Sequence, residues 1–379
     1  MKPLIPSIPT VGVTGSAGKS TTTNFIHAIF KTKWKNVLKT EGNLNLPKHT
    51  KQNVQKIKRY HQAVILEMGL GREAGKNHFR YIKPNIGVIT NIGTAHYGKL
   101  GNSIESIARA KSAMIRYMNP EGLLLINKDD ANSRLLQTKA FKGKLVTVGI
   151  KSRAPYQATN IEYLNNGMSF QVKLGNSKEA FFIPTFGNHN IINALFAIAI
   201  ADHLDFTPSQ IRQGLKNYRP PSRRLNVISL PKPNGALLID DTFNANPQSV
   251  KAAVNVLQQL GKGKRKIIVL GSMLELGKYT VKGHGEVGNY LARKGIHEIF
   301  VYGKKAKMIK QAALHSGFPA RNVHHFVKRE HLHERLKLSL VPDAVILVKG
   351  SHRMQMKETA EFIARYSLRM SRNQGSLSR

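Results

Sequence analysis

The chain has 379 residues, with 59 Lys and Arg against 21 Asp and Glu, so its formal charge at pH 7 is +38. It contains no cysteine and is 41% hydrophobic, which is enough for more than one core. These figures exclude disulfide scaffolds, cysteine-ligated metal centres, thiol nucleophiles, and collagen-like or wholly disordered chains. No run of about 18 apolar residues is present, and the Pro-rich N-terminus lacks the apolar core of a signal peptide. We therefore expect a cytoplasmic protein of two or three domains without a transmembrane helix.

Residues 10–150 alternate short apolar runs with helical patterns, which predicts a largely parallel sheet covered by helices. The expected strands are VGVTG (11–15), AVILEMG (63–69), IGVITNIG (86–93) and GLLLIN (122–127), and the expected helices run from about Lys19 to Lys31 and from Ser103 to about Met118. Residues 155–184 alternate around NNG, which is typical of a hairpin and predicts a small antiparallel appendage. GNHNIINALFAIAIAD (187–202) predicts a long apolar helix.

The segment RPPSRR (219–224) predicts a hinge linker, because two prolines interrupt a helix and the arginines favour solvent. It separates a first domain, residues 1–218, from a second, residues 225–379. In the second domain the apolar runs ALLIDD, KIIVLG, EIFVYG and AVILVKG alternate with helical patterns. This alternation predicts a Rossmann-like α/β domain.

A phosphate-binding loop follows the first expected strand. Thr14 to Thr22 read TGSAGKSTT, and a helix is expected to begin within this segment. Glycines let backbone N–H groups face phosphate oxygens, and the helix N-terminus adds a positive field. The strict motif has a glycine where this chain has Val13, so only the shorter GxxGK[ST] form is present. The nucleotide-binding residues predicted here are Gly15, Ser16, Ala17, Gly18, Lys19, Ser20 and Thr21; the alternative is a glycine turn with a chance lysine.

Further motifs resemble those of the Mur ligases. They are EGNLN (41–45), EMG (67–69), TNIGTAHYGKLGNSIESIARAKS (90–112), GNHNIINALFAIAIA (187–201), RRLN (223–226), IDDTFNANPQS (239–249), VLGSMLELG (269–277) and VKGS (348–351). Their order and spacing are most similar to the branch that adds D-alanyl-D-alanine to UDP-MurNAc-tripeptide. The resemblance covers about residues 10–360. It implies a P-loop central ATPase domain followed by a C-terminal Rossmann-like domain.

The resemblance also implies the reaction. In the family, a substrate carboxylate attacks the γ-phosphate of ATP and becomes an acyl phosphate, which an amine then attacks to form an amide. ATP and Mg²⁺ are the implied cofactors. Lys19 is implied to reach the phosphates, and Ser20 and Glu67 to hold one Mg²⁺. His96 and Lys111, the latter carbamylated by CO₂, are implied ligands of a second Mg²⁺.

Other implied residues lie on both sides of the linker. Asn193 is the candidate for a base contact, whereas Asn188 suggests a helix cap. Arg224 matches the arginine that reaches the ATP phosphates, and Asp241 the ribose-binding acid, although Asp240 is equally compatible with that role. The substrate-side candidates are Asn244, Asn246, Glu275, His284, Lys349 and Ser351, and His352 is where we expect a difference in amine choice.

One departure concerns the substrate. The family carries an N-terminal UDP-sugar domain, whereas here the P-loop begins at Thr14. Two interpretations remain open within the family: a muropeptide ligase, with or without a separate UDP-binding subunit, and a ligase for a non-UDP carboxylate. A third is a non-catalytic nucleotide-binding scaffold that binds polyanions. The charge predicts attraction to anionic surfaces, but no nucleic-acid recognition signature is present.

Overall fold

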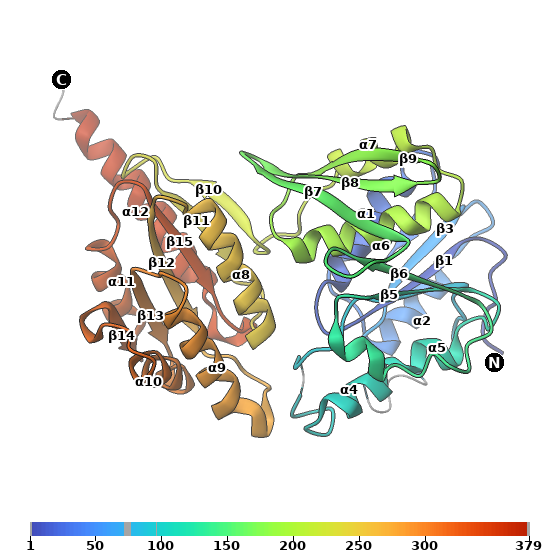
Figure 1. Ribbon diagram of the computed structural model, residues 1–379, viewed down its shortest axis with the longest axis horizontal. Helices are drawn as coiled ribbons and strands as arrows, with labels where there is room; N and C mark the ends of the chain where they lie inside the picture. Colours follow the sequence, from blue (N-terminus) through green and yellow to red (C-terminus); the bar gives the residue numbers. More distant parts are fainter. Residues whose placement is uncertain (1, 72–76, 96, 377–379) are drawn as a thin grey trace. The chain divides into compact units, whose positions relative to one another are not determined.

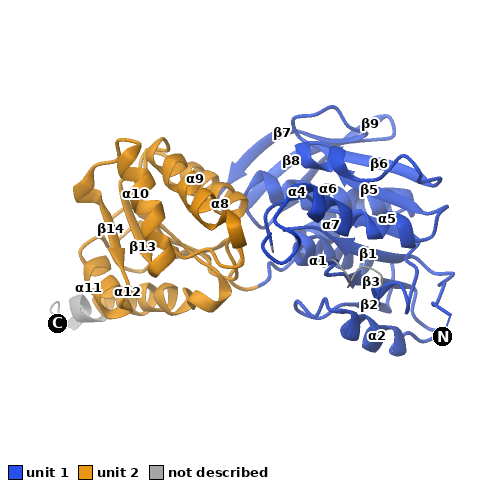
Figure 2. Ribbon diagram, turned by 90° about the horizontal axis from the view of Figure 1, so that it is seen from below, with its two compact units in different colours: residues 1–221 blue, residues 222–379 orange. Residues whose placement is uncertain are grey.

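The computed structural model describes residues 2–71, 77–95 and 97–376 (Figure 1). The chain divides into two compact units, unit 1 (Met1–Pro221) and unit 2 (Ser222–Arg379), each built on one sheet (Figure 2). The division falls inside RPPSRR. Within the described part of the chain, no helix is long and apolar enough to cross a membrane.

Unit 1 contains a nine-stranded sheet. Its first seven strands in spatial order run parallel, and the seventh, β7, also begins an antiparallel meander with β8 and β9. In spatial order the strands are β2 (Val37–Lys39), β3 (Ala63–Glu67), β1 (Thr10–Thr14), β4 (Ile86–Ile89), β5 (Leu123–Asn127), β6 (Lys144–Gly149), β7 (Tyr156–Leu164), β8 (Gly167–Leu174) and β9 (Ser177–Ile183). Strands β1, β3 and β4 are buried along their whole length, as is typical of central strands of a parallel sheet, and most of their residues are apolar.

Helices pack on this sheet. They are α1 (Lys19–Phe30), α2 (Pro47–Gln55), α4 (Ile104–Lys111), α5 (Ala113–Tyr117), the 3₁₀ helix η1 (Ala131–Leu135), α6 (Asn188–His203) and α7 (Pro208–Lys216). Helix α6 is buried at every position from Asn190 to Ala201 and packs against α1. An all-round apolar surface is typical of such a central helix.

Two local predictions differ from the structure. The helical stretch 103–118 is two helices, α4 and α5, which meet at Ser112; the Oγ of Ser112 donates to the carbonyl of Ala108. A serine hydroxyl that bonds its own helix backbone favours such a break. The predicted cap by Asn188 is wrong, because Gly187, with φ of 98°, is the N-cap residue of α6 and Asn188 is its first helical residue.

The antiparallel meander continues the parallel sheet. NNG lies at the turn between β7 and β8, and β7 joins β6 through the pairs Val148–Tyr156 and Gly149–Gln157. Residues 156–183 therefore belong to the nine-stranded sheet and do not form a separate appendage (Figure 1).

Unit 2 contains a six-stranded sheet that is parallel except for its edge strand β10. In spatial order the strands are β10 (Asn226–Ser229), β11 (Leu237–Asp241), β15 (Ala344–Lys349), β12 (Arg265–Gly271), β13 (Glu298–Tyr302) and β14 (Val323–Phe326). The helices are α8 (Pro247–Leu260), η2 (Gly277–Tyr279), α9 (Thr280–Ala292), η3 (Lys304–Ala306), α10 (Lys307–His315), η4 (Ala320–Asn322), α11 (Arg329–Lys337), η5 (His352–Met354) and α12 (Lys357–Ser376). The predicted fold class, two α/β domains, is confirmed.

Candidate active site

The P-loop joins β1 to α1 where β1 has β3 on one side and β4 on the other. Ligands of open α/β sheets bind at such points, because the loops on the two sides diverge. Gly15 and Gly18 have φ of 144° and 82°, a range that favours glycine. A Cβ on Gly15 would overlap Oγ1 of Thr90, and one on Gly18 would overlap Oδ1 of Asn193. Both glycines are therefore required by the shape of this loop.

The turn after β4 holds the P-loop in place. The backbone N–H groups of Ser16 and Ala17 both donate to Oδ1 of Asn91, over 3.1 and 3.0 Å. The Oγ of Ser16 donates to the carbonyl of Gly93 over 3.0 Å and accepts from its N–H over 2.9 Å. Thr90 Oγ1 donates to the carbonyl of Ala17 over 2.5 Å. The two adjacent amides of Ser16 and Ala17 therefore share one acceptor oxygen of Asn91, which fixes the conformation of the loop.

The first turn of α1 carries the remaining P-loop residues. Lys19 begins the helix, and its Nζ donates to the carbonyl of Gly15 over 3.0 Å. Ser20 and Thr21 are buried. The predicted P-loop residues, Gly15 to Thr21, therefore lie in one loop and one helical turn.

Glu67 ends β3 beside this turn and is only 2% exposed. Ser20 Oγ donates to its Oε2 over 2.6 Å, and Asn45 Nδ2 donates to its Oε1 over 2.7 Å. The N–H of Glu67 donates to Thr40 Oγ1 over 3.0 Å. The structure therefore brings together Ser20 and Glu67, the two predicted ligands of one Mg²⁺.

Lys111 is the last residue of α4 and is 5% exposed. Burial lowers the pKa of its amine to about 7, and the positive charge of Lys19 contributes in the same direction. The described residues thus include a buried lysine with a readily available neutral amine, close enough to Lys19 for their charges to interact. His96, its predicted companion, lies outside the described residues.

Asn193 lies beneath the P-loop in α6. Its Oδ1 accepts from Thr22 Oγ1 over 3.2 Å, and its Nδ2 donates to Asn190 Oδ1 over 3.2 Å. It is buried and packs against Gly18. In this arrangement Asn193 supports the loop, and its contact with the nucleotide base stays a prediction.

In unit 2, Arg224 precedes β10 and lies over the ring of Phe243, with Cζ 3.9 Å from the ring centroid. Both its neighbours, Arg223 and Leu225, have positive φ, 60° and 53°. Such backbone strain in non-glycine residues clusters at functional sites. The segment therefore holds Arg224 in an orientation that an ordinary extended strand would not give.

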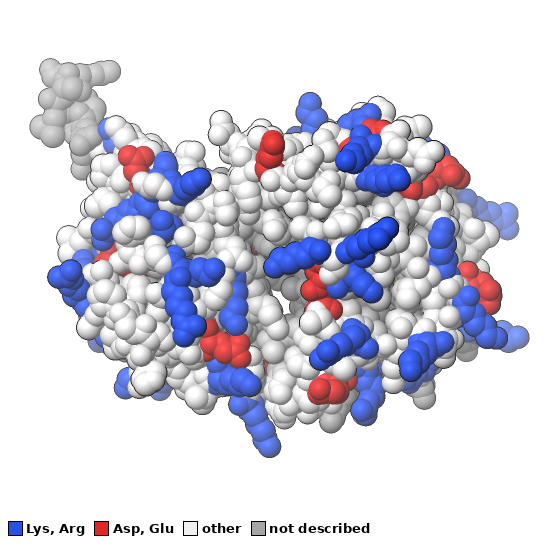
Figure 3. Space-filling view, in the orientation of Figure 1, with Lys and Arg blue, Asp and Glu red and all other residues white. Residues whose placement is uncertain are grey.

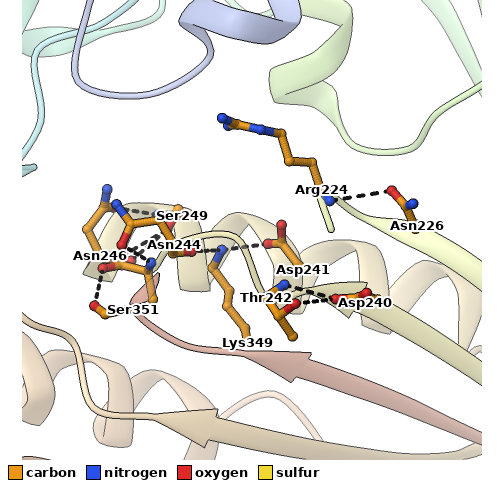
Figure 4. A network of polar contacts seen from close by, with 11 residues as sticks. Arg224, Asn226, Asp240, Asp241, Thr242, Asn244, Asn246, Ser249, Lys349 and Ser351 are labelled. Carbon is orange, nitrogen blue, oxygen red and sulfur yellow. Dashed lines mark hydrogen bonds and ion pairs between the residues drawn. The ribbon is translucent and has the colours of Figure 1, made fainter. Parts of the chain in front are cut away.

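Asp241 and Lys349 form a buried ion pair at the ends of the neighbouring strands β11 and β15 (Figure 4). The Nζ of Lys349, whose side chain is 3% exposed, lies 2.6 Å from Asp241 Oδ2 and donates to the carbonyl of Asn244 over 2.8 Å. Burial raises the pKa of Asp241, and Lys349 opposes that shift. Asp240 instead accepts from Thr242, through both its N–H and its hydroxyl. The two aspartates therefore differ: Asp241 pairs with Lys349, and Asp240 closes a local turn.

The loop after β11 leads into α8. Asn246 is the N-cap residue of α8; its Oδ1 accepts from the N–H of Ser249 over 2.9 Å. Ser351 Oγ accepts from the N–H of Leu274 over 2.8 Å and donates to the carbonyl of Ala245 over 3.4 Å. Ser351 therefore links the loops after β11, β12 and β15, while Asn244 is exposed beside it.

Glu275 and His284 belong to the next loop and helix. Glu275 has φ of 63°, again in the left-handed region. His284 is fully buried: its Nε2 accepts from the N–H of Met273 over 3.0 Å, and its Nδ1 donates to the carbonyl of Thr280 over 2.7 Å. Burial lowers the pKa of this imidazole. The neutral ring anchors the loop after β12, and a direct contact with substrate stays a prediction. His352 is exposed near Phe243, with the ring centroids 6.1 Å apart.

The donors around Ser20 fit a magnesium ion. A hydroxyl and a carboxylate are hard oxygen ligands, and Mg²⁺ usually retains waters and phosphate oxygens beside one or two protein groups. Among the described residues there is no group of three or more His, Cys, Asp or Glu placed to hold a metal.

Several contacts of the site were not predicted. Asn45 lies in the motif EGNLN, but the motif did not indicate that the side-chain amide of Asn45 bonds Glu67. Phe243 likewise lies in a quoted motif and was not expected beneath Arg224. No sequence signal marked Asp130, which bonds the turn after β4. Only the folded chain brings such distant residues together.

The basic side chains do not form one patch on the face shown in Figure 3. Lys and Arg are spread over the visible part of each unit, with acidic side chains between them. On this face, therefore, the basic side chains do not gather at a single site.

The two folds and their sites define a P-loop nucleotide-binding protein with a second α/β unit. The profile of the Mur ligase middle domain matches residues 13–201, and that of the Mur ligase, glutamate ligase domain matches residues 223–352. The chain belongs to the Mur ligase family. It is accordingly an ATP-dependent ligase that forms peptide bonds.

Curated relatives of the chain include ligases that share one name. UDP-N-acetylmuramoyl-tripeptide–D-alanyl-D-alanine ligase of Bacillus subtilis is 33% identical over 349 residues, covering 92% of this chain and 74% of the relative. The enzyme of the same name from Escherichia coli is 30% identical over 355 residues, covering 92% and 75%. Each share exceeds two thirds, so the similarity extends over most of both proteins.

Solved structures agree with this grouping. MurF from Acinetobacter baumannii has a TM-score of 0.83 at 29% identity and covers 94% of this chain and 76% of its own. MurF from Thermotoga maritima in complex with ADP has a TM-score of 0.81 at 21% identity, covering 96% and 81%. The second likeness supports the fold alone.

Proposed function

We propose that this chain joins D-alanyl-D-alanine to the peptide carboxylate of UDP-N-acetylmuramoyl-tripeptide. The observation that carries the proposal is the similarity to enzymes named for this reaction over 92% of the chain. The bonded Ser20–Glu67 pair beside the P-loop is consistent with it. The proposal includes a cytoplasmic location, because ATP is a substrate.

The chemistry has two steps. The acceptor carboxylate attacks the γ-phosphorus of ATP, the bond to the β-phosphate oxygen breaks, and ADP leaves. The amine of the dipeptide then attacks the acyl carbon, the acyl–phosphate bond breaks, and phosphate leaves as the amine loses a proton. Catalysis of the first step is mainly positioning and charge neutralisation.

The residues of unit 1 suit the first step. The ammonium of Lys19 and the N-terminus of α1 suit the phosphate oxygens. The amides of Ser16 and Ala17 bond Asn91 and so fix the loop that leads into this helix. Ser20 and Glu67 would hold Mg²⁺, which supplies charge neutralisation on the phosphates when bound. Lys111 would serve as a further oxygen ligand once its neutral amine has attacked CO₂ and lost a proton to give the carbamate. The burial of Lys111 supports this role.

In unit 2, Arg224 and Asp241 are proposed to contact the phosphates and the ribose. Asn244, Glu275 and Ser351 are proposed to contact the dipeptide, and Lys349 keeps the Asp241 loop in shape through its ion pair. Asn246 and His284 would act by fixing the loops on which these residues lie.

The experiment is phosphate release with ATP and Mg²⁺, with the products identified by mass. UDP-MurNAc-tripeptide and the same muropeptide without UDP are offered in turn, each with D-alanyl-D-alanine or with D-alanine. We expect the UDP-MurNAc-pentapeptide. Turnover only with the UDP-free acid would replace the proposal with a ligase for a non-UDP carboxylate.

A matched pair of variants guards against a contaminating ATPase. Lys19→Ala should abolish product formation, whereas Lys31→Ala, at an exposed lysine just after α1, should leave it unchanged. ADP binding without turnover of any substrate pair would contradict the proposal. It would favour a nucleotide-binding scaffold or a requirement for a separate UDP-binding subunit.

A further inference from the structure

The turn after β4 is held from a second side by η1. Asp130, the N-cap residue of η1, accepts from the N–H of Ile92 through Oδ2 over 2.7 Å. Asn132, two residues later, donates from Nδ2 to the carbonyl of Ile92 over 2.9 Å. Asp130 therefore bonds the amide of Ile92, and Asn132 bonds its carbonyl.

The residues on both sides of Ile92 are those that hold the P-loop. Asn91 accepts from the amides of Ser16 and Ala17, and Gly93 exchanges two hydrogen bonds with the Ser16 hydroxyl. Rotation of the Ile92 peptide would therefore move the acceptors on which both P-loop amides converge. Ile92 itself is buried, so packing restrains its side chain while Asp130 and Asn132 restrain its backbone.

The carboxylate of Asp130 is itself constrained. It also accepts from the N–H of Asn132 over 3.3 Å and from Ser133 Oγ over 3.0 Å. A side chain whose own conformation is fixed by hydrogen bonds restrains the backbone group that it bonds. The contacts thus run from η1 through Ile92 to Asn91 and Gly93, and from there to Ser16 and Ala17.

We propose that Asp130, with Asn132, is a positioning residue for nucleotide binding: it sets the conformation of the P-loop through residues 91–93 without touching the nucleotide. The proposal rests on the use of ATP at this loop, which is part of the proposed function. It predicts that loss of Asp130 weakens nucleotide binding by leaving the P-loop amides without a defined acceptor arrangement.

Asp129 provides a matched control. It is the adjacent carboxylate and also accepts backbone amides, but these are Ile150, Lys151 and Ser152, over 2.6, 3.1 and 2.7 Å. Asp129→Ala and Asp130→Ala therefore remove the same group from neighbouring positions, and each leaves a turn without its acceptor. Of these two carboxylates, only that of Asp130 bonds the turn that holds the P-loop.

The test is the Kd for ADP, measured by calorimetry, together with KM for ATP, kcat and Tm. Asp130→Ala should raise Kd about tenfold, which is typical of coupled neighbouring residues, and should raise KM for ATP in parallel. Asp130→Asn, which keeps an acceptor oxygen for Ile92, should recover most of the affinity. Asp129→Ala should lower Tm to a similar extent and change Kd less than twofold. An unchanged Kd in Asp130→Ala, or equal rises in both alanine variants, would overturn the inference.

A double-mutant cycle identifies the route. If Asp130 acts through Asn91, then Asp130→Ala added to Asn91→Ala should raise Kd little beyond Asn91→Ala alone; full additivity would contradict that route. Asn132→Ala removes only the hydrogen bond to the Ile92 carbonyl and should raise Kd about threefold. This variant tests the inference even if Asp130→Ala does not fold. Failure of the wild-type chain to bind ADP would overturn the proposed function together with this inference. Normal wild-type binding with no effect in any variant would overturn the inference alone.

Discussion

Both units place candidate site residues at the C-terminal ends of parallel strands, but the interactions that fix these residues differ between the units. In unit 1, the neutral side chain of Asn91 bonds the P-loop, and those of Asn45 and Ser20 bond the carboxylate of Glu67. In unit 2, a buried ion pair between Asp241 and Lys349 joins two strand ends. Substitutions at the unit 1 site should therefore act mainly on turnover, and substitution at the unit 2 pair mainly on the stability of that unit.

The largest effect is expected at Glu67. Glu67→Gln should lower kcat/KM about 10³-fold, or about 4 kcal/mol, because an amide replaces the charged oxygen beside Ser20. The measurement is steady-state kinetics, with circular dichroism to check the fold. Glu121→Gln, at an exposed glutamate before β5, is the control and should behave as wild type. Near-normal turnover in Glu67→Gln would refute a ligand role for Glu67.

The buried pair of unit 2 should show the opposite behaviour. Lys349→Met removes the ammonium that pairs with the buried carboxylate of Asp241 and should lower the free energy of unfolding of unit 2 by about 3–5 kcal/mol. Lys337→Met breaks the exposed pair with Glu334 and should change it by less than about 1 kcal/mol. Denaturant unfolding measures both changes.

A second substitution sharpens that result. Adding Asp241→Asn to Lys349→Met should recover part of the lost stability, because the unpaired charge is removed. If the double variant is no more stable than Lys349→Met, the loss comes from packing and not from the charge of Asp241.

Lys111 should make unit 1 sensitive to pH. Its folded pKa, about 7, lies below the ordinary 10.5, so between these values the unfolded chain binds more protons and stability rises with pH. In CO₂-free buffer, wild type should gain at most about 2 kcal/mol relative to Lys111→Met from pH 7 to about pH 8.5. Parallel profiles of stability against pH in the two proteins would show that burial does not lower the pKa of this amine.

A second test concerns the carbamate of Lys111. Bicarbonate should raise the activity of wild type and leave that of Lys111→Met unchanged.

The smallest effect is expected at Phe243. Phe243→Leu removes the ring beneath Arg224, a cation–π contact worth about 0.5–1 kcal/mol, and should raise KM for ATP about threefold. Tyr302→Leu removes a similar ring beneath Arg329, 5.2 Å from its Cζ, and should leave KM unchanged. Equal shifts in both variants would mean that the rings act through general packing.

Local signals were strong enough to predict part of this molecule. The P-loop was predictable because its glycines, lysine and following hydroxyl are adjacent in sequence and lie between a strand and a helix. The break at Ser112 and the cap at Gly187 were not, because helix ends depend on individual local hydrogen bonds that a residue pattern does not specify. The edge strands β2, β10 and β14 also went unpredicted; each is only three or four residues long.

The sequence by itself determined the two α/β folds, the nucleotide loop and the family, because apolar periodicity and contiguous motifs are local properties of the chain. The tertiary structure alone decided which distant side chains meet. Asn91 lies 75 residues from Ser16, Asp130 lies 38 from Ile92, and Lys349 lies 108 from Asp241. The sheet brings such residues together because parallel strands end at one edge, and the strand order, which no single segment encodes, decides which strand ends are neighbours.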